Sequence, residues 1–128
     1  MTSGSPRGAE TPGRFDILER SFAFSLRILK VVRALSRDSA SQVIARQIAR
    51  SGTSVGANIE EAQGSQSRAE FARRMNIARS EALETRYWLR LLAESGLLAR
   101  MRLEPLIQEA DELVRILVTI IRNSRRST

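Results

Sequence analysis

Apolar side chains recur at alternating steps of four and three residues through the middle of the chain. This seam consists of Phe71, Met75, Ala78, Ala82, Thr85, Leu89 and Leu92, with Thr85 as its polar member. The spacing predicts a helix over about residues 68–95 that packs along one side against other helices. Ser67 followed by Glu70 is typical of a capping box at the start of that helix, and Gly96 is typical of the position just after a helix end.

The same periodicity predicts three further helices, over about residues 15–36, 38–63 and 103–123. Asp38 or Ser39 can cap the second of them, and Pro105 is expected in the first turn of the last. Gly52 and Gly56 fall inside the second helix, where they weaken the helix but let a neighbouring helix approach closely. The alternative, a phosphate-binding loop, lacks both the GxxxxGK[ST] pattern and a preceding strand.

Four helices joined by short loops predict an all-α fold, an up-and-down antiparallel four-helix bundle over residues 15–124. A chain of 128 residues with 42% apolar residues is of a size for one domain. Residues 1–14 are rich in Ser, Thr, Pro and Gly and are expected to form a disordered lead-in, and residues 125–128 a basic tail. The sequence has no apolar run of about 20 residues and no secretory signal, so a cytoplasmic location is expected.

The predicted first helix carries two opposed apolar faces. One face holds Phe15, Leu18, Phe22, Leu26 and Leu29, and the other holds Ile17, Phe24, Ile28, Val31 and Leu35. A surface helix of a monomer usually has one apolar face. Because no helix of a four-helix bundle is fully surrounded, the second face favours contact with a partner chain over a central position in the bundle.

A second apolar stripe on the 68–95 helix, formed by Ile77, Trp88 and Leu91, faces away from the seam. Trp88 is a typical anchor of a protein interface, and the alternative is a tryptophan packed under a neighbouring helix of its own chain. The extra stripes on the two helices predict a closed homo-oligomer. Its predicted subunit interface consists of Ile17, Phe24, Ile28, Val31, Ile77, Trp88 and Leu91.

A polar line runs beside the apolar seam of the predicted second helix. It consists of Gln47, Ser51, Ser54, Asn58 and Glu61. Such a line next to a core can form an interhelical polar network that fixes the register of the helices. The alternative for the same residues is a ligand-binding site.

The composition removes most enzyme classes. The chain has no cysteine and no histidine, so the common zinc sites, Ser-His-Asp and Cys-His catalysis, and His-ligated haem are excluded. One enzymatic alternative is a cluster of Glu61, Glu81 and Glu84 around a divalent metal, but these residues fall on different helix faces beside arginines. We therefore expect a protein that is not an enzyme, with no catalytic residue, metal or cofactor.

The chain has a formal net charge of +7, and its basic residues are arginines except for Lys30. Arginine suits bidentate phosphate contacts, so this charge is typical of nucleic-acid binding, and the alternative of a merely solvated surface stays equally open. Four arginines on one flank of the 68–95 helix form either a phosphate track or ion pairs with nearby glutamates. With three near the carboxyl terminus, the predicted nucleic-acid-binding residues are Arg68, Arg79, Arg86, Arg90, Arg122, Arg125 and Arg126.

One long motif carries a family resemblance. The run RSGTSVGANIEEA over residues 50–62 is followed over residues 71–92 by F-x-x-[RK]-[ML]-x-I-A-x-x-E-A-x-E-T-x-Y-W-L-R-L-L. Residues 15–124 thereby resemble the bacterial four helix bundle protein family, whose founding members are encoded by intervening sequences in 23S ribosomal RNA genes. They are more distantly similar to the accessory variability determinant of diversity-generating retroelements.

The resemblance implies a barrel-shaped homopentamer around a central channel, and it implies an accessory protein that engages structured RNA and a reverse transcriptase. Among the predicted arginines the family motif supports only Arg86 and Arg90 by position, and the chain departs from the lysine-rich composition of its relatives. We therefore expect a non-enzymatic oligomeric accessory protein that binds structured nucleic acid, RNA or RNA/DNA, through an arginine-rich surface, with a reverse transcriptase as a further partner. The alternative is a protein–protein adaptor with no nucleic-acid role.

Overall fold

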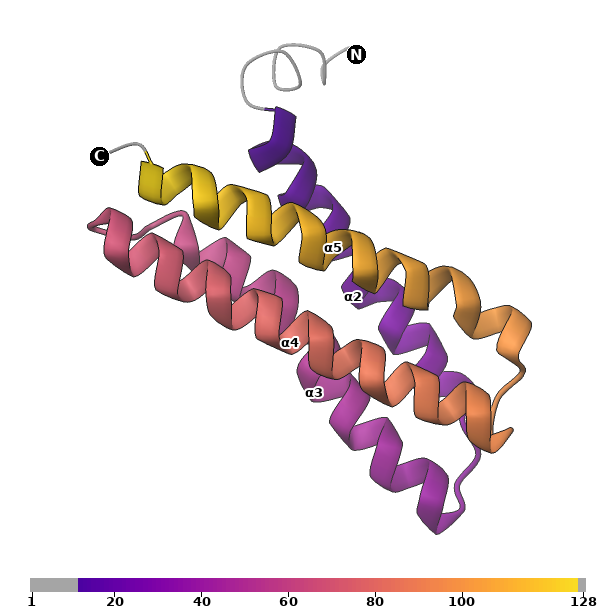
Figure 1. Cartoon of the computed structure of the whole chain (residues 1–128). Helices are drawn as coiled ribbons and strands as arrows, with labels where there is room; N and C mark the ends of the chain where they lie inside the picture. The colour runs from indigo at the N-terminus through magenta and orange to yellow at the C-terminus, as the bar shows by residue number, and fades with distance from the viewer. Residues whose placement is uncertain (1–11, 127–128) are drawn as a thin grey trace, which may run out of the picture.

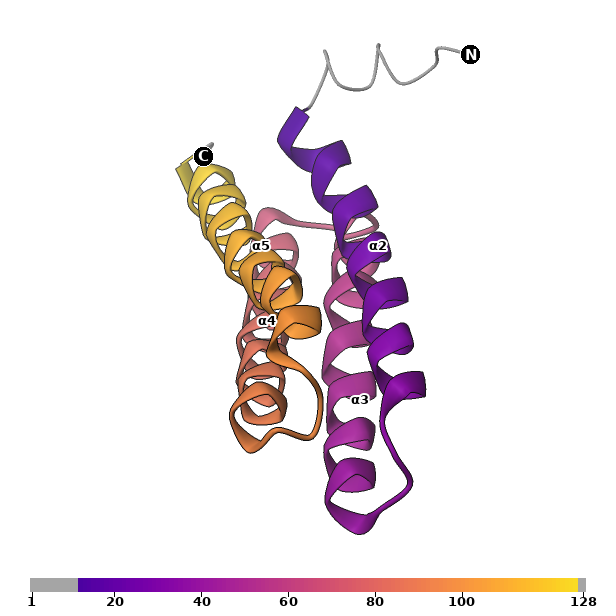
Figure 2. The ribbon, with the colours of Figure 1, turned by 90° about the vertical axis from the view of Figure 1, so that its right-hand side faces the viewer.

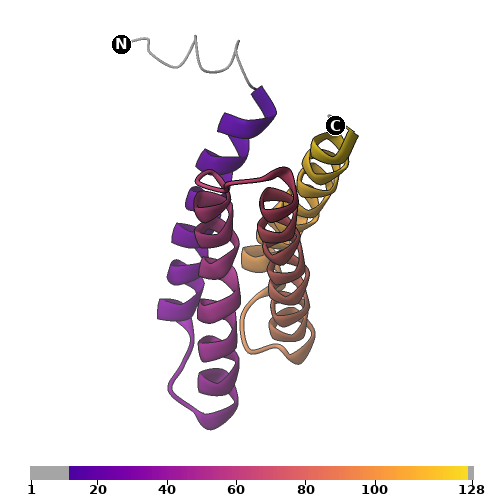
Figure 3. The ribbon, with the colours of Figure 1, turned by 90° about the vertical axis from the view of Figure 1, so that its left-hand side faces the viewer.

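The computed structural model describes residues 12–126, with side chains from residue 17 onward, as four helices without a strand. In the labels of Figure 1 the helices are α2 (Pro12–Ala34), α3 (Ser39–Ala62), α4 (Arg68–Ser95) and α5 (Arg100–Arg126). Each helix packs against the next one along the chain, and α5 returns to α2, whereas the diagonal pairs have no Cα atoms within 8 Å of each other among the described residues. Figures 2 and 3 show the resulting antiparallel bundle, in which the α2–α3 hairpin stands beside the α4–α5 hairpin.

The helices extend further than the sequence predicted at both ends of the bundle. Residues 12–14, assigned to the lead-in, belong to α2, and Arg125 and Arg126, assigned to the tail, complete α5. Because α5 begins at Arg100 rather than residue 103, Pro105 lies in its second turn, and its placement in the first turn was wrong. The rest of the predicted lead-in and tail, residues 1–11 and 127–128, lies outside the described residues.

The helix ends form as the local sequence predicts, with one difference. Asp38 caps α3 by accepting a hydrogen bond from the Ser41 backbone N–H at 2.9 Å, and Ser67 caps α4 by accepting one from the Glu70 N–H at 3.1 Å. The Glu70 carboxylate accepts from the Gln66 N–H at 3.0 Å, one residue before the cap, where a capping box would use the cap residue itself. Gly96, with a φ of 76°, ends α4 in the left-handed region that glycine adopts without strain.

One apolar stripe from each helix fills the core. The largest fully buried side chains are Ile17, Phe24, Ile28, Ile48, Val55, Ile59, Met75, Leu89, Leu92, Leu103, Leu113 and Leu117. The contact between α2 and α5 is the least extensive of the four helix pairs. There Arg20 and Glu109 form a two-pronged ion pair, with N···O distances of 3.0 and 2.7 Å. This geometry ties the first helix to the last where packing is sparsest.

In the structure, the two apolar faces of α2 have the opposite roles from those that the sequence predicted. Ile17, Phe24, Ile28 and Val31, which the sequence assigned to a subunit interface, are buried in the core of their own chain. The opposite face points outward instead, since Phe22 is 66% exposed, and Leu26 and Leu29 are also exposed. The assignment of those four residues to a partner contact was therefore wrong.

The glycines of α3 lie against the buried face of α2 and make room for it. A Cβ atom at Gly52 would lie 2.8 Å from both Cγ1 and Cγ2 of Ile28, so the α3 backbone rests directly against that side chain. At Gly56 the nearest atoms belong to Ser21, at 3.4 Å. Both glycines lie inside a helix, as predicted, and they permit α2 and α3 to approach closely along the face that carries Ile28.

Candidate nucleic-acid interface

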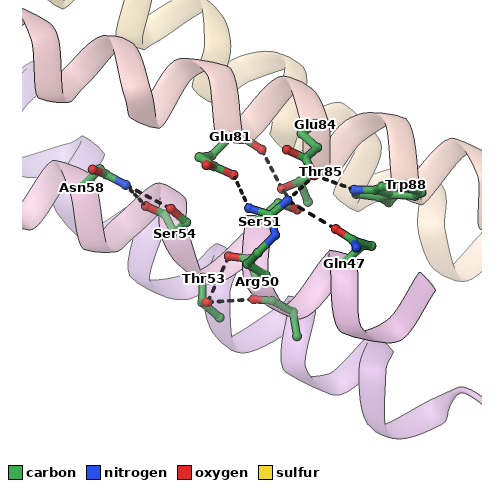
Figure 4. Close-up of polar contacts among 11 residues, drawn as sticks. Gln47, Arg50, Ser51, Thr53, Ser54, Asn58, Glu81, Glu84, Thr85 and Trp88 are labelled. Atoms are coloured by element: carbon green, nitrogen blue, oxygen red, sulfur yellow. Dashed lines mark hydrogen bonds and ion pairs between the residues drawn. The ribbon is translucent and has the colours of Figure 1, made fainter. Parts of the chain in front are cut away.

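The predicted polar network of α3 reaches α4 at two of its positions. The hydroxyl oxygens of Ser51 and Thr85 lie 2.8 Å apart and share a hydrogen bond between α3 and α4 (Figure 4), and both residues are fully buried. At the other end of the line, Glu61 accepts a hydrogen bond from Arg74 of α4 at 2.6 Å. A buried hydroxyl pair of this kind has one favourable register and therefore fixes how the two helices align.

The remaining members of the line bond within α3. The Asn58 amide donates to the carbonyl and the hydroxyl oxygens of Ser54, at 2.9 and 3.0 Å, and Gln47 accepts from Arg50. An interhelical role for Gln47, Ser54 and Asn58 is therefore not seen among the described residues. Polar side chains on a helix flank bond readily to groups one turn away, and this local partner replaces the one across the seam.

The second stripe of α4 lies at the α3–α4 seam. Trp88 is partly buried against the core, as the single-chain alternative predicted, and its indole N–H donates to Glu84 at 3.0 Å. Glu84 also pairs with Arg50, which contacts Glu81 as well (Figure 4). Ile77 and Leu91 are half-buried, so a subunit contact through these α4 residues stays a prediction.

These ion pairs also account for the glutamates of the enzymatic alternative. Glu81 and Glu84 face Arg50, whereas Glu61 faces Arg74. Within the part of the chain that the structure describes, no group of three or more acidic side chains is arranged to hold a metal ion. Nor does any helix there contain an apolar stretch long enough to cross a membrane.

The predicted arginine row divides into two parts. Arg86 donates to Asp111 of α5 at 2.9 Å, so its charge is balanced. Arg90 lies toward the α4–α5 loop, where Arg100 pairs with Glu94 at 2.7 Å. The pKa of Glu94 is lowered chiefly by the hydrogen bond and charge of Arg100, with a smaller contribution from Arg90. Near the α4–α5 loop, the basic side chains therefore lie close to an acidic one.

At the opposite end, the start of α4 lies beside the end of α5 (Figure 1). Arginines from these two segments line two adjoining hollows. One hollow is lined by Asn76, Arg79, Val118, Ile121, Arg122, Arg125 and Arg126. The other is lined by Arg68, Ala69, Ala72, Arg73, Asn76 and Arg125. Each has a volume of about 480 Å³, and they share Asn76 and Arg125. We call the two hollows together the basic groove.

The basic groove contains five of the predicted arginines and two residues that sequence reasoning missed. Arg86 and Arg90 do not line it, whereas the other predicted arginines do. Arg73 was overlooked beside Arg74, yet Arg74 turns to Glu61 and Glu70 while Arg73 faces the groove. Asn76 carries no charge that could have marked it, and its carbonyl oxygen accepts a hydrogen bond from the Arg79 Nε–H at 2.8 Å.

The comparisons with known proteins agree with this architecture. The family model of the 23S rRNA-intervening sequence protein matches residues 14–119. A crystal structure from Bacteroides thetaiotaomicron, of a protein with unknown function from the S23 ribosomal protein family, is 38% identical. It superposes with a TM-score of 0.81 over 86% of this chain and 98% of that chain. No curated protein matches this sequence. Sequence and fold together show that the chain belongs to the 23S rRNA-intervening sequence protein family.

Proposed function

We propose that this protein is a non-enzymatic, oligomeric accessory protein that binds structured nucleic acid through the basic groove. The observation that carries the proposal is the lining of the groove, which holds six arginines and no acidic residue. Elsewhere on α4 and α5, several arginines are paired with acidic groups, for example Arg86 with Asp111 and Arg115 with Glu112. The groove is thus a concentration of positive charge on the α4–α5 hairpin.

Concentrated positive charge suits the phosphate backbone of RNA or DNA. Each guanidinium that contacts a phosphate releases condensed counterions, so affinity falls steeply as salt concentration rises. Such contacts position a nucleic acid without reading its sequence. The family name refers to an intervening sequence of 23S rRNA, and this origin agrees with an RNA ligand. A reverse transcriptase is a further partner to be tested.

The test is the binding of a labelled RNA hairpin, followed by fluorescence anisotropy at about 50 and 300 mM salt. The groove variant carries Arg73→Gln and Arg122→Gln, and the matched control carries Arg90→Gln and Arg115→Gln. Both pairs remove two charges, one from each helix, but only the first pair lines the groove.

The proposal expects wild-type binding at low salt and little at high salt. It expects the groove variant to lose about 0.7–0.9 from the slope of log affinity against log salt for each phosphate contact removed, with a smaller change in the control. Equal losses in the two variants would show that net charge, and not the groove, determines binding. A wild-type protein that ignores the hairpin at both salt concentrations would refute the proposed function.

A protein–protein adaptor is the second candidate function, and a different surface favours it. Phe22, Leu26 and Leu29 expose an apolar face along the outer side of α2. Burying such a face against a partner is favourable and changes little with salt. Salt-tolerant association with a protein, without any affinity for the hairpin, is the result that favours this candidate.

A further inference from the structure

The side chains of the basic groove offer hydrogen-bond donors and almost no acceptors. Its arginines carry five N–H donors each and no acceptor, and its alanine, valine and isoleucine side chains offer neither. The one side-chain acceptor is the Asn76 carbonyl oxygen, and it already receives the Arg79 Nε–H at 2.8 Å. A matching ligand must therefore present acceptors.

This chemistry favours phosphate over the other groups of a macromolecule. Peptide N–H groups and base edges carry donors for which the groove offers only the second lone pair of the Asn76 oxygen, whereas phosphate oxygens only accept. No aromatic side chain lines either hollow, so the stacking that single-stranded nucleic acids use is missing there.

The contact between Asn76 and Arg79 also prepares the guanidinium for its ligand. With the Nε–H held by Asn76, the two terminal nitrogens of Arg79 remain as a fork for two phosphate oxygens. Holding a long side chain in place before binding reduces the rotamer entropy that is lost on binding. Asn76 therefore acts as a positioning residue, and Arg79 as the group that touches the ligand.

From these contacts we infer that the basic groove, where its two hollows adjoin, is a clamp for two neighbouring phosphoryl groups. Arg79, oriented by Asn76, binds the first together with Arg122, and Arg68 and Arg73 bind the second. The ligand is either a pair of consecutive backbone phosphates or a pyrophosphate group, which share this chemistry. The backbone arm of the inference rests on the proposed function, whereas the pyrophosphate arm does not.

The experiment is a calorimetric titration with inorganic pyrophosphate and with an RNA hairpin that carries no terminal phosphate, followed by competition between them. We expect one pyrophosphate per chain and mutual displacement. Asn76→Asp places a carboxylate beside Arg79 and is expected to weaken both ligands about tenfold. Gln108→Glu makes the same change of charge on an exposed part of α5 outside the groove, and it is expected to stay within about twofold of wild type. Asn76→Ala removes the positioning contact without adding charge, and a smaller loss of about threefold is expected.

Each outcome supports or overturns a stated claim. If the hairpin binds but pyrophosphate does not displace it, or if Asn76→Asp behaves like Gln108→Glu, the clamp is wrong and the proposed function stands. If pyrophosphate binds and the hairpin does not, the clamp stands and the proposed function falls. If neither binds, both fail. An acidic peptide that displaces pyrophosphate at equal concentration would overturn the selectivity for phosphate.

Discussion

Replacing Gly52 by alanine tests how closely α2 and α3 must approach. The new methyl group would lie 2.8 Å from Cγ1 and Cγ2 of Ile28 and 3.2 Å from its Cβ, whereas carbon atoms ordinarily pack about 3.5–4.0 Å apart. Ile28 is fully buried, and a β-branched side chain in a helix has essentially one rotamer. The contact can therefore be relieved only by a shift of the helices themselves.

Two effects of opposite sign set the magnitude of the change. Alanine favours a helix over glycine by up to about 1 kcal/mol, whereas overpacking a well-filled core costs about 1–3 kcal/mol. Because both branches of Ile28 meet the new methyl group, the steric cost should exceed the gain. We expect Gly52→Ala to lower the free energy of unfolding by about 1–2 kcal/mol.

Gly56→Ala is the matched control in the same helix. Its methyl group would lie 3.4 Å from the Ser21 carbonyl and hydroxyl oxygens, which is ordinary contact. The propensity gain should therefore prevail, with a stabilisation of about 0.5–1 kcal/mol. Urea denaturation followed by far-ultraviolet circular dichroism, at one protein concentration, measures both variants.

The reasoning is refuted if Gly52→Ala is as stable as Gly56→Ala. A second measurement isolates the contact itself, because Ile28→Ala removes both Cγ atoms. In that background, Gly52→Ala should destabilise the protein far less, because only the 3.2 Å contact with the remaining Cβ opposes the helix propensity gain and the partly filled cavity. An unchanged cost in the Ile28→Ala background would place the strain elsewhere.

Three further predictions concern a buried contact, a helix cap and the outer face of α2. Thr85→Val keeps the shape of the side chain but leaves the buried Ser51 hydroxyl without its partner on α4. We expect urea denaturation to show a loss of about 1–3 kcal/mol in the free energy of unfolding, and adding Ser51→Ala should largely recover it. Hydrogen bonds from the Ser36 hydroxyl and then from the Ser41 N–H lower the pKa of Asp38 from 3.8 to about 2, so its contribution to stability is present above pH 4 and is lost as the pH falls through 2. Urea midpoints across this range should show Asp38→Ala less stable than wild type at neutral pH and equal to it at the acid end, and a constant difference would contradict the assignment. The double variant Phe22→Ser and Leu26→Ser should leave the unfolding midpoint nearly unchanged, because both side chains are exposed. If this face of α2 joins subunits, the variant should have a lower mass by light scattering than the wild-type protein. An unchanged oligomeric mass would exclude this face as the subunit contact.

Local sequence was sufficient wherever a feature depends on a few neighbouring residues. The apolar seam of α4, its Ser67 cap and the left-handed Gly96 all follow from spacing and from single-residue chemistry. The glycines of α3 were also interpretable, because helical spacing continues through them. Four periodic segments with short connections then leave an antiparallel bundle as the natural arrangement.

Only the tertiary structure decided which side chains are buried and which charges are paired, because both depend on the neighbours that a side chain meets. The two faces of α2 are similarly apolar, and the tertiary structure buries the one on which Ile28 fits against Gly52. The arginines of α4 share one flank in sequence, but Asp111 of α5 neutralises Arg86, whereas the end of α5 brings three more arginines beside Arg79. Periodicity sets the direction of a side chain around its own helix, whereas partner, burial and local charge depend on elements distant along the chain, and packing alone brings these together.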